Sequence, residues 1–406
     1  MIRLDFNLVG GLADQAIVSL GNFALTVLLA RALPAAQYGE FSVALSFILF
    51  FNTLHQALVI YPLSVRGASA SAEAFPPLAG AALLLTPLCA LAFLPGLGAG
   101  LVSVARLDLL GPAFLALLAW QWQEVVRRGL LARRRFAAAI AIDLVRYFGT
   151  AGAVLGLAHD LTPGWVFLLI AALSLAAILP FLPDGWRAAR PAARHLGAEL
   201  AGHWRLAAPV LGASLLTALS VQWFLWLLAW QGRPDHAAAL VALANIVSIA
   251  NPLILGIENI LVPEIARLRD RLDTAALVRL AARRGLACAA LIAPFFLAIL
   301  LFPEQAARLF YGAATPYAGQ PGCLRILVAA YVTTLAAAVV GAALRGLQAS
   351  GAVFRMQLYP ALLGLTLGSW LTWRFGVPGA CLAALLAGLV RTGAGLRFLL
   401  RFGEAR

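Results

Sequence analysis

The sequence predicts an all-α membrane protein with about twelve transmembrane helices. Of its 406 residues, 63% are hydrophobic and only 12% are charged, and the mean hydropathy is +0.91. Soluble domains are roughly half apolar and about a quarter charged. The apolar residues of this chain form long blocks, and a helix needs roughly 20 such residues to cross about 30 Å of hydrocarbon. These observations predict a multi-pass helical architecture.

Twelve apolar segments are candidate spans. In chain order they are expected near residues 8–32, 38–62, 76–98, 108–130, 137–158, 164–183, 204–230, 237–262, 285–302, 322–344, 355–374 and 377–400. Turn-forming residues separate them, as in "LPAAQYG", "LPGLGAG" and "FGVPGA". The connections near 184–203 and 264–284 are basic and partly amphipathic, which is typical of helices that lie on a membrane face.

All thirty basic residues are arginine, and most of them lie on one side of the predicted membrane. When the loops between the predicted spans are numbered in chain order, the termini and the even-numbered loops share one side of the membrane and hold 22 of the arginines. The odd-numbered loops on the opposite side hold 6, and Arg146 and Arg391 lie inside spans. Because positively charged loops stay in the cytoplasm, both termini are expected there.

The composition also argues against several classes of protein. A chain without lysine can carry neither a Walker phosphate loop nor a Schiff-base mechanism. The net charge is +13, but the chain has no soluble basic domain that could bind nucleic acid, so no nucleic-acid partner is expected. The four cysteines stand singly and the five histidines form no ligand pattern, so neither a metal nor another cofactor is expected. We find no paired-carboxylate or nucleophile motif, so an enzyme is not expected.

Two sequence echoes predict an internal repeat. "RGLLA" at 128–132 recurs as "RGLQA" at 345–349, and "YPLSVR" at 61–66 is echoed by "VPEIAR" at 262–267, with offsets of 217 and 201 residues. A duplicated six-span lobe is a known way to build a transporter with a site between its halves. We therefore expect two pseudo-symmetric six-helix lobes, 1–186 and 204–406, around a central cavity, with a cytoplasmic amphipathic linker at 187–203.

The residues also resemble a known family. "SLGNFALTVLLARALPAAQYGEFSVALSFILFF" at 19–51 resembles the first hairpin of polysaccharide flippases, which belong to the multidrug/oligosaccharidyl-lipid/polysaccharide exporter superfamily. "NPLILGIENILVPEIARLRD", "ALRGLQASG" and "FGVPGACLAALLAGLVR" in the later half are similar to it as well. The resemblance implies two six-helix bundles that move lipid-linked sugars across the inner membrane by alternating access.

Three functions are weighed against each other. The first is a monomeric flippase of the bacterial inner membrane for an anionic, polyprenyl-pyrophosphate-linked oligosaccharide, which arginine suits because its planar fork binds phosphate. The second is a cation-coupled multidrug exporter of the same superfamily, which needs acidic residues in its cavity. The third, a membrane enzyme of the same pathway, is disfavoured because the outer loops are short.

Ionisable residues inside spans are functional candidates, since insertion there costs about 2.5–3.5 kcal/mol each. Arg146 lies roughly 14 Å along its span, near the midplane, and is a candidate phosphate contact. The alternative is an ion pair with Asp143, three residues earlier on the same face. Glu124 is expected to pair with Arg127 or Arg128.

The remaining candidates come from polar stripes and loop arginines. Asp14 shares a face of the first span with Asn22 and Thr26 and either caps the helix or couples H+ or Na+ transport. The eighth span carries a stripe that either joins helices or lines a cavity. The cavity candidates are Arg146, Arg31, Arg66, Arg391, Asn245, Asn251 and Gln56, and the ion-coupling candidates are Asp14, Glu258 and Asp143.

Overall fold

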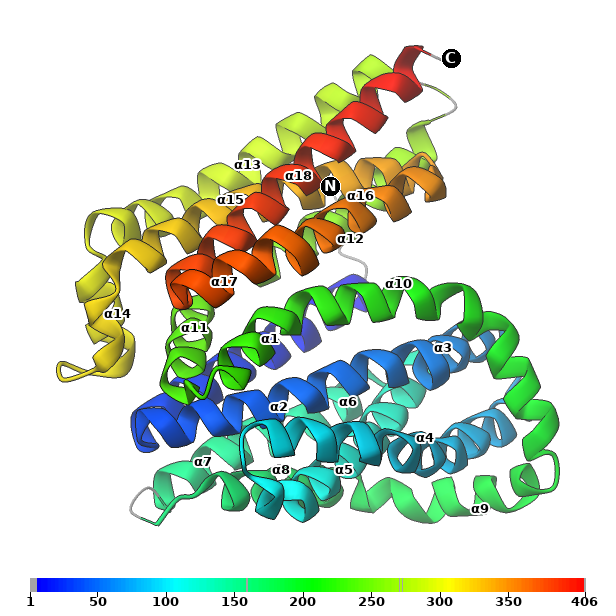
Figure 1. Cartoon of the computed structure of the whole chain (residues 1–406). Coiled ribbons are helices and arrows are strands. Elements are labelled where there is room, and N and C mark those ends of the chain that lie inside the picture. The colour runs from blue at the N-terminus through cyan, green and yellow to red at the C-terminus, as the bar shows by residue number, and fades with distance from the viewer. Residues whose placement is uncertain (1–5, 158–159, 270, 272, 405–406) are drawn as a thin grey trace. The chain divides into compact units, whose positions relative to one another are not determined.

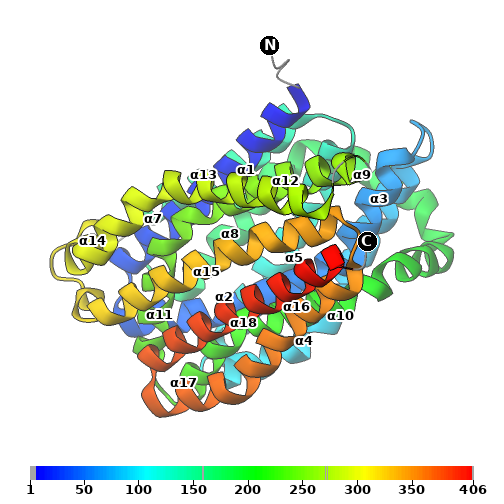
Figure 2. The same cartoon turned by 90° about the horizontal axis from the view of Figure 1, so that it is seen from above.

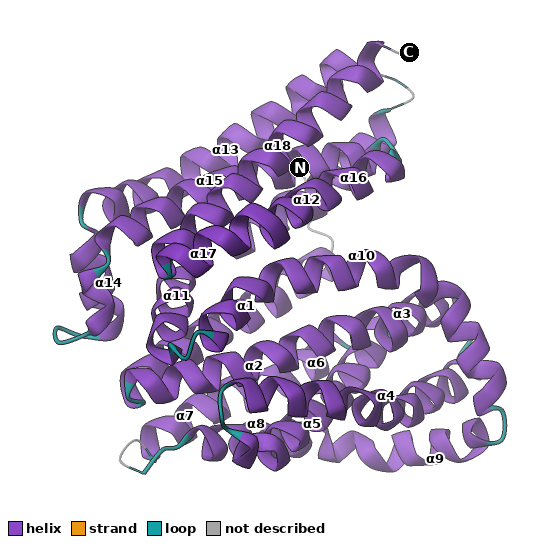
Figure 3. Ribbon diagram, viewed as in Figure 1, coloured by secondary structure: helices purple, strands orange, loops and turns teal. Residues whose placement is uncertain are grey.

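The computed structural model describes residues 6–157, 160–269, 271 and 273–404 (Figure 1). These residues form helices and loops and include no strand (Figure 3). The chain divides into two compact units, Met1–Gln222 and Trp223–Arg406, here called the N-unit and the C-unit. The boundary falls inside one continuous helix, α10 (Leu196–Trp230). The division predicted at 187–203 stays a prediction.

The helices of the first half are consecutive and are joined by short loops or by brief changes of helix type. They are α1 (Phe6–Ala32), α2 (Ala35–His55), η1 (Gln56–Ile60), α3 (Tyr61–Ser69), α4 (Phe75–Ser103), η2 (Leu107–Leu109), α5 (Leu110–Ala132), α6 (Phe136–Asp143), η3 (Leu144–Phe148), α7 (Gly149–Gly156), α8 (Pro163–Ile178), η4 (Leu179–Phe181) and α9 (Leu182–Ala193).

The second half begins with α10 and repeats this order. Its other elements are α11 (Pro234–Val247), η5 (Ser248–Ala250), α12 (Asn251–Leu268), α13 (Thr274–Leu301), α14 (Pro303–Tyr311), η6 (Pro316–Gly319), α15 (Pro321–Gly346), α16 (Ser350–Leu363), η7 (Gly364–Gly368), α17 (Ser369–Phe375) and α18 (Val377–Glu404).

The predicted fold class is confirmed. Nine continuous helices within the described residues are long and apolar enough to cross a membrane. Three further long helices stand where spans were predicted, namely α1, α5 and the run α16–η7–α17. The apolar part of α1 found among the described residues is Ile17–Ala32. The helix α5 is apolar except for polar residues that include Gln121, Gln123 and Glu124. The chain is an all-α polytopic membrane protein.

Both sequence echoes fall on equivalent helices. Pro62 lies in α3 and Pro263 in α12, each in the second long helix of its half. Gly129 lies in α5 and Gly346 in α15, each in the fourth. A Cβ atom at Gly346 would stand 2.7 Å from Cβ of Ile265, so α15 and α12 approach closely at this point. The repeat therefore extends from the sequence to the order and pairing of helices.

The second and fifth long helices of each half also contain a change of helix type, π in three cases and 3-10 at Ser248–Ala250. The second long helix changes type at Gln56–Ile60 and at Ser248–Ala250. The fifth contains a π-helical turn at Leu144–Phe148 and again at Gly364–Gly368. Single π-turns inside α-helices are rare and often mark functional sites. The π-turns in these helices are therefore candidate functional positions.

Small residues let helices of the C-unit approach closely. α15 and α18 lie side by side in both views (Figures 1 and 2), and Thr392 Oγ1 of α18 donates a hydrogen bond to the carbonyl of Thr333 at 3.0 Å. A Cβ atom at Gly388 would stand only 2.1 Å from Thr333 Oγ1. Close backbone approach and side-chain hydrogen bonds replace the hydrophobic effect, which is weak between helices in lipid.

One predicted connection was wrong. Residues 264–284 were expected to form a surface helix, but α12 continues to Leu268 and α13 begins at Thr274. Arg279, Arg283 and Arg284 of this segment lie on an exposed face of α13, whereas Leu277 and Ala281 are buried in the C-unit. The amphipathic pattern therefore belongs to the end of a long spanning helix.

Candidate functional site

Arg146 occupies the middle of the π-helical turn η3 in the fifth long helix. Its side chain is buried in the N-unit, with 5% of its surface exposed. Thr150 Oγ1 donates a hydrogen bond to the carbonyl of Arg146 at 2.5 Å, and the backbone N–H of Gly149 donates to the same carbonyl. A π-turn also shifts the direction in which side chains leave the helix. Arg146 is thus held in the interior.

Aromatic rings form the immediate surroundings of this guanidinium. The Cζ atom of Arg146 lies 3.6 Å from the ring centre of Trp120 in α5 and 4.7 Å from that of Tyr147. A cation over an aromatic face gains about 2 kcal/mol when desolvated, which offsets much of the cost of burying the charge. Because ring faces leave the N–H groups at the edge of the guanidinium available, this arrangement suits an anion receptor.

Asp143 pairs with a different arginine from the one predicted. Arg127 Nε of α5 donates to Asp143 Oδ2 at 2.6 Å, and Gln123 Nε2 lies 3.4 Å from Asp143 Oδ1. Arg127 and Asp143 are 6% and 2% exposed, so this is a buried interhelical ion pair. Arg146 interacts electrostatically with Asp143, but the carboxylate of Asp143 is bound directly by Arg127 of another helix.

Glu124 completes a charge network beside Arg146. Its carboxylate accepts from Arg127 Nη1 at 3.3 Å and from Arg128 Nε at 2.6 Å, as predicted from their spacing on one helix. Gln56, at the start of the π-turn η1, also hydrogen-bonds this carboxylate. The predicted cavity candidate Gln56 is thus tied to the network, which joins the second, fourth and fifth long helices.

A small cavity of about 20 Å³ adjoins Arg146. Asn22 and Thr26 of α1 line it, together with Trp120, Tyr147 and neighbouring apolar side chains. A cavity of roughly 10–15 Å³ holds one water molecule, so this space suits a water and is too small for a phosphate. In this conformation the site is closed, and an anion could reach Arg146 only after helices move apart.

The C-unit contains a second charge cluster, here called the Glu258 cluster. Arg345 Nη2 of α15 lies 2.9 Å from Glu258 Oε1 of α12. Arg391 of α18 interacts electrostatically with both, and no described residue accepts a hydrogen bond from its buried Nε atom. Two arginines therefore converge on one carboxylate, which leaves a net positive charge.

Arg66 of α3 contacts two residues at the start of α10. Its Nη1 atom lies 2.7 Å from Glu199 Oε2 and 3.4 Å from His203 Nδ1, both in the first turns of α10. His203 Nδ1 lies 2.9 Å from the carbonyl of Glu199. Burial lowers the pKa of His203 below its usual value of 6.5. These contacts fasten the start of α10 to α3.

The other predicted residues are dispersed. Arg31 is exposed in the last turn of α1, and the side chain of Asp14 lies outside the described residues. Asn245 of α11 is buried and donates to Tyr311 Oη at 3.4 Å, which links α11 to α14. Asn251 hydrogen-bonds Tyr331 of α15. Asn245 and Asn251 of the polar stripe thus contact other helices, and the cavity-lining alternative stays a prediction.

Sequence reasoning missed two partners of Arg146. Neither Trp120 nor Tyr147 was singled out from the sequence as a contact of Arg146. An aromatic residue next to an intramembrane arginine is the signal that could have indicated Tyr147. In the part of the chain that the structure describes, no group of three or more His, Cys, Asp or Glu residues could hold a metal ion.

The fold is that of known transporters. No protein-family model matches the chain, and no curated protein matches it in sequence. Among solved structures, an inward-facing multidrug resistance MATE family transporter of the MOP superfamily is similar, with a TM-score of 0.71, 16% identity and coverage of 95% of this chain and 96% of that one. The lipid II flippase MurJ in an inward closed conformation is also similar, with a TM-score of 0.77, 10% identity and coverage of 96% and 87%.

A third similar structure is a MATE family transporter of the same superfamily in an outward-facing conformation. Its TM-score is 0.58, its identity is 15%, and the match covers 98% of this chain and 94% of that one. At these identities the likeness concerns the fold. Two of these three structures are named as multidrug resistance transporters and one as a lipid II flippase.

Proposed function

We propose that this protein is a transporter that flips a polyprenyl-pyrophosphate-linked oligosaccharide across a bacterial inner membrane by alternating access. The termini lie in the cytoplasm in this proposal, and the protein acts as a monomer. The main support for the proposal is that the buried charge is positive in sign. Each carboxylate described in the interior of the spans, Glu124, Asp143 and Glu258, contacts arginine, and Arg146 and Arg391 add further positive charge.

A surplus of buried guanidinium favours an anionic substrate over a cationic one. Pyrophosphate oxygens accept the paired hydrogen bonds that the planar arginine fork offers. The membrane potential supports export as well, because each negative charge moved outward gains about 2.3 kcal/mol per 100 mV. The proposed contact is Arg146, whose aromatic cradle holds the guanidinium without using its N–H groups.

The alternative, a cation-coupled drug exporter, requires a carboxylate free to bind a cation. Asp143 and Glu258 would have to leave their arginines before they could bind a drug, H+ or Na+. Asp14 remains an ion-coupling candidate from the sequence. Coupling to an ion is compatible with either substrate and is tested separately by imposing an ion gradient.

The test is transport by purified protein in proteoliposomes. A fluorescent polyprenyl-pyrophosphate oligosaccharide would be followed by its protection from an external quencher, and a cationic dye would be tested in parallel. Arg146→Lys keeps the charge but loses the bidentate fork. We expect flipping to fall about tenfold or more, since a hydrogen bond to a charged group contributes about 1.5–3 kcal/mol.

Arg308→Lys is the matched control, because Arg308 of α14 is exposed and forms only a loose surface pair with Glu304, at 4.0 Å. This variant should flip the lipid-linked oligosaccharide at the rate of the unaltered protein. Thermal unfolding in detergent would verify that both variants fold. Full flipping by folded Arg146→Lys, or export of the dye with no flipping of the lipid-linked sugar, would contradict the proposal.

A further inference from the structure

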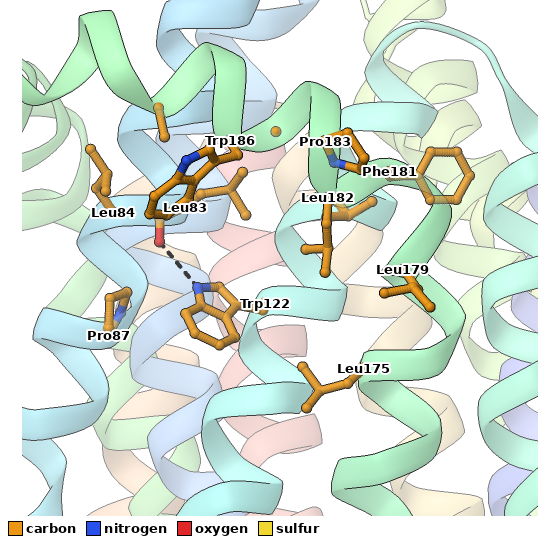
Figure 4. A pocket seen from close by; sticks show the side chains of 13 residues that line it. Leu83, Leu84, Pro87, Trp122, Leu175, Leu179, Phe181, Leu182, Pro183 and Trp186 are labelled. Carbon is orange, nitrogen blue, oxygen red and sulfur yellow. Dashed lines mark hydrogen bonds between the residues drawn. The ribbon is translucent and has the colours of Figure 1, made fainter.

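An apolar cavity of about 570 Å³ lies within the N-unit, between α4, α5, α8 and α9 (Figure 4). This volume falls in the range of roughly 300–1,000 Å³ that is typical of ligand sites. Its walls are leucine, valine, alanine, proline, glycine, phenylalanine and tryptophan side chains, with no charged residue among them. The sequence predicted helices here but no cavity.

Close contacts between α9 and α4 build one wall. A Cβ atom at Gly80 of α4 would stand 2.4 Å from the carbonyl oxygen of Ala188, and one at Gly185 would stand 2.9 Å from Leu83 Cδ1. α9 therefore crosses α4 with almost no side chain between the two backbones. Because the crossing is fixed at these glycines, the larger side chains beside it leave a hollow.

The indole N–H of Trp122, one of two tryptophans in the cavity wall, is not available to a ligand. Trp122 Nε1 already donates to the carbonyl of Leu83 at 3.1 Å, as the dashed line in Figure 4 marks. Because its lining side chains are apolar, the cavity suits a hydrocarbon occupant. Leu179 and Trp186 are 63% and 64% exposed, so the cavity opens toward the surroundings, where lipid chains are the available hydrocarbon.

Basic residues stand next to the cavity lining. The guanidinium of Arg135 lies 5.9 Å from the ring centre of Phe181, a lining residue. Arg187 and Arg190 are exposed on α9 beside lining residues, and Asp184 is the one carboxylate on that helix. By the arginine distribution this is the cytoplasmic side. The surplus of positive charge is complementary to an anionic headgroup.

The cavity is separate from the Arg146 site. Trp120 contacts Arg146 and Trp122 lines the cavity, and residues two apart on a helix point in nearly opposite directions. The two cavities share no lining residue. A tail bound here would not belong to a substrate whose phosphate is at Arg146.

We propose that this cavity binds an acyl chain of an anionic phospholipid from the cytoplasmic leaflet, with its phosphate held by Arg135 and the arginines of α9. The bound lipid would brace α9, the helix that precedes α10 and the C-unit. The inference stands on the cavity and its surrounding charges, independently of what the protein transports.

The test is lipid retention by the purified full-length protein, measured by native mass spectrometry. The protein would be equilibrated with phosphatidylglycerol, with phosphatidylcholine of the same chains, and with polyprenyl phosphate. We expect selective retention of one phosphatidylglycerol. Removing Arg135 and Arg190 by Arg→Gln substitution should lower that retention by roughly fivefold per charge. Arg279→Gln with Arg283→Gln on α13 removes equal charge from an exposed face and should change nothing.

A second variant tests the hydrocarbon part of the site. Leu175→Trp adds bulk at the cavity wall and should reduce retention of the lipid, whereas Leu291→Trp, on an exposed position of α13, should not. A diazirine-labelled phosphatidylglycerol on the unaltered protein should crosslink to α8 or α9. Equal retention of phosphatidylcholine, preference for polyprenyl phosphate, or crosslinks confined to other helices would each overturn the proposal.

Discussion

Replacing Asp143 by asparagine should destabilise the protein strongly, because Arg127 would be left with an uncompensated buried charge. The carboxylate and the guanidinium of this pair are 2.6 Å apart, and their side chains are 2% and 7% exposed. Removing one partner of a buried ion pair costs about 3–5 kcal/mol. Glu124 remains 3.3 Å from Arg127, which places the cost at the lower end. We expect about 3 kcal/mol, or roughly 100-fold in the unfolding equilibrium.

The assay is equilibrium unfolding in mixed micelles, followed by tryptophan fluorescence. Asp184→Asn is the matched control, since Asp184 pairs with Arg187 at 3.1 Å but the two side chains are 84% and 78% exposed. Such a surface pair contributes less than about 1 kcal/mol. The unfolding midpoint of Asp184→Asn should therefore stay close to that of the unaltered protein.

A double-mutant cycle isolates the pair itself. Arg127→Gln and Asp143→Asn each leave a buried charge, whereas the double variant removes both charges and should recover at least about 1.5 kcal/mol relative to the sum of the single changes. Strictly additive effects, or an Asp143→Asn variant as stable as Asp184→Asn, would refute the assignment of a buried interhelical ion pair.

Three further outcomes are expected. Gly388→Ala should cost about 1–3 kcal/mol in the same unfolding assay, since its Cβ atom would lie 2.1 Å from Thr333 Oγ1, while Gly393→Ala on the same helix meets nothing within 4 Å and should not destabilise. Burial lowers the pKa of His203, and protonation would place an N–H on its buried Nε2, so the free energy of unfolding should be full above the ordinary pKa of 6.5 and fall as the pH drops below it. His203→Asn should flatten this pH dependence between pH 7.5 and 5.5, and an unchanged slope in the variant would contradict the role of His203. A reporter that is active only in the periplasm should stay silent when fused after residue 406, whereas a strong signal would reverse the predicted topology.

The sequence by itself determined the fold class and the order of the helices. In hydrocarbon every backbone N–H and C=O must be paired within the protein, and continuous apolar runs of about 20 residues do this as helices, whose hydrogen bonds all lie within the segment. The echoes around Pro62 and Gly346 likewise identified equivalent helices, because both halves repeat one order of elements. Contacts between neighbours on a helix were predictable too, and Glu124 pairs with Arg128 as its i,i+4 spacing indicated.

Contacts between different helices were decided only by the tertiary structure. Asp143 is three residues from Arg146 on the same helix, yet its 2.6 Å partner is Arg127 on another one. The π-turn at Leu144–Phe148 changes the direction of Arg146, which meets Trp120 across the helix interface. The apolar cavity exists because α9 crosses α4 at Gly80. Periodicity reports which face of a helix is apolar or charged, whereas partners and hollows depend on how helices cross, which is set by close packing of side chains from distant parts of the chain.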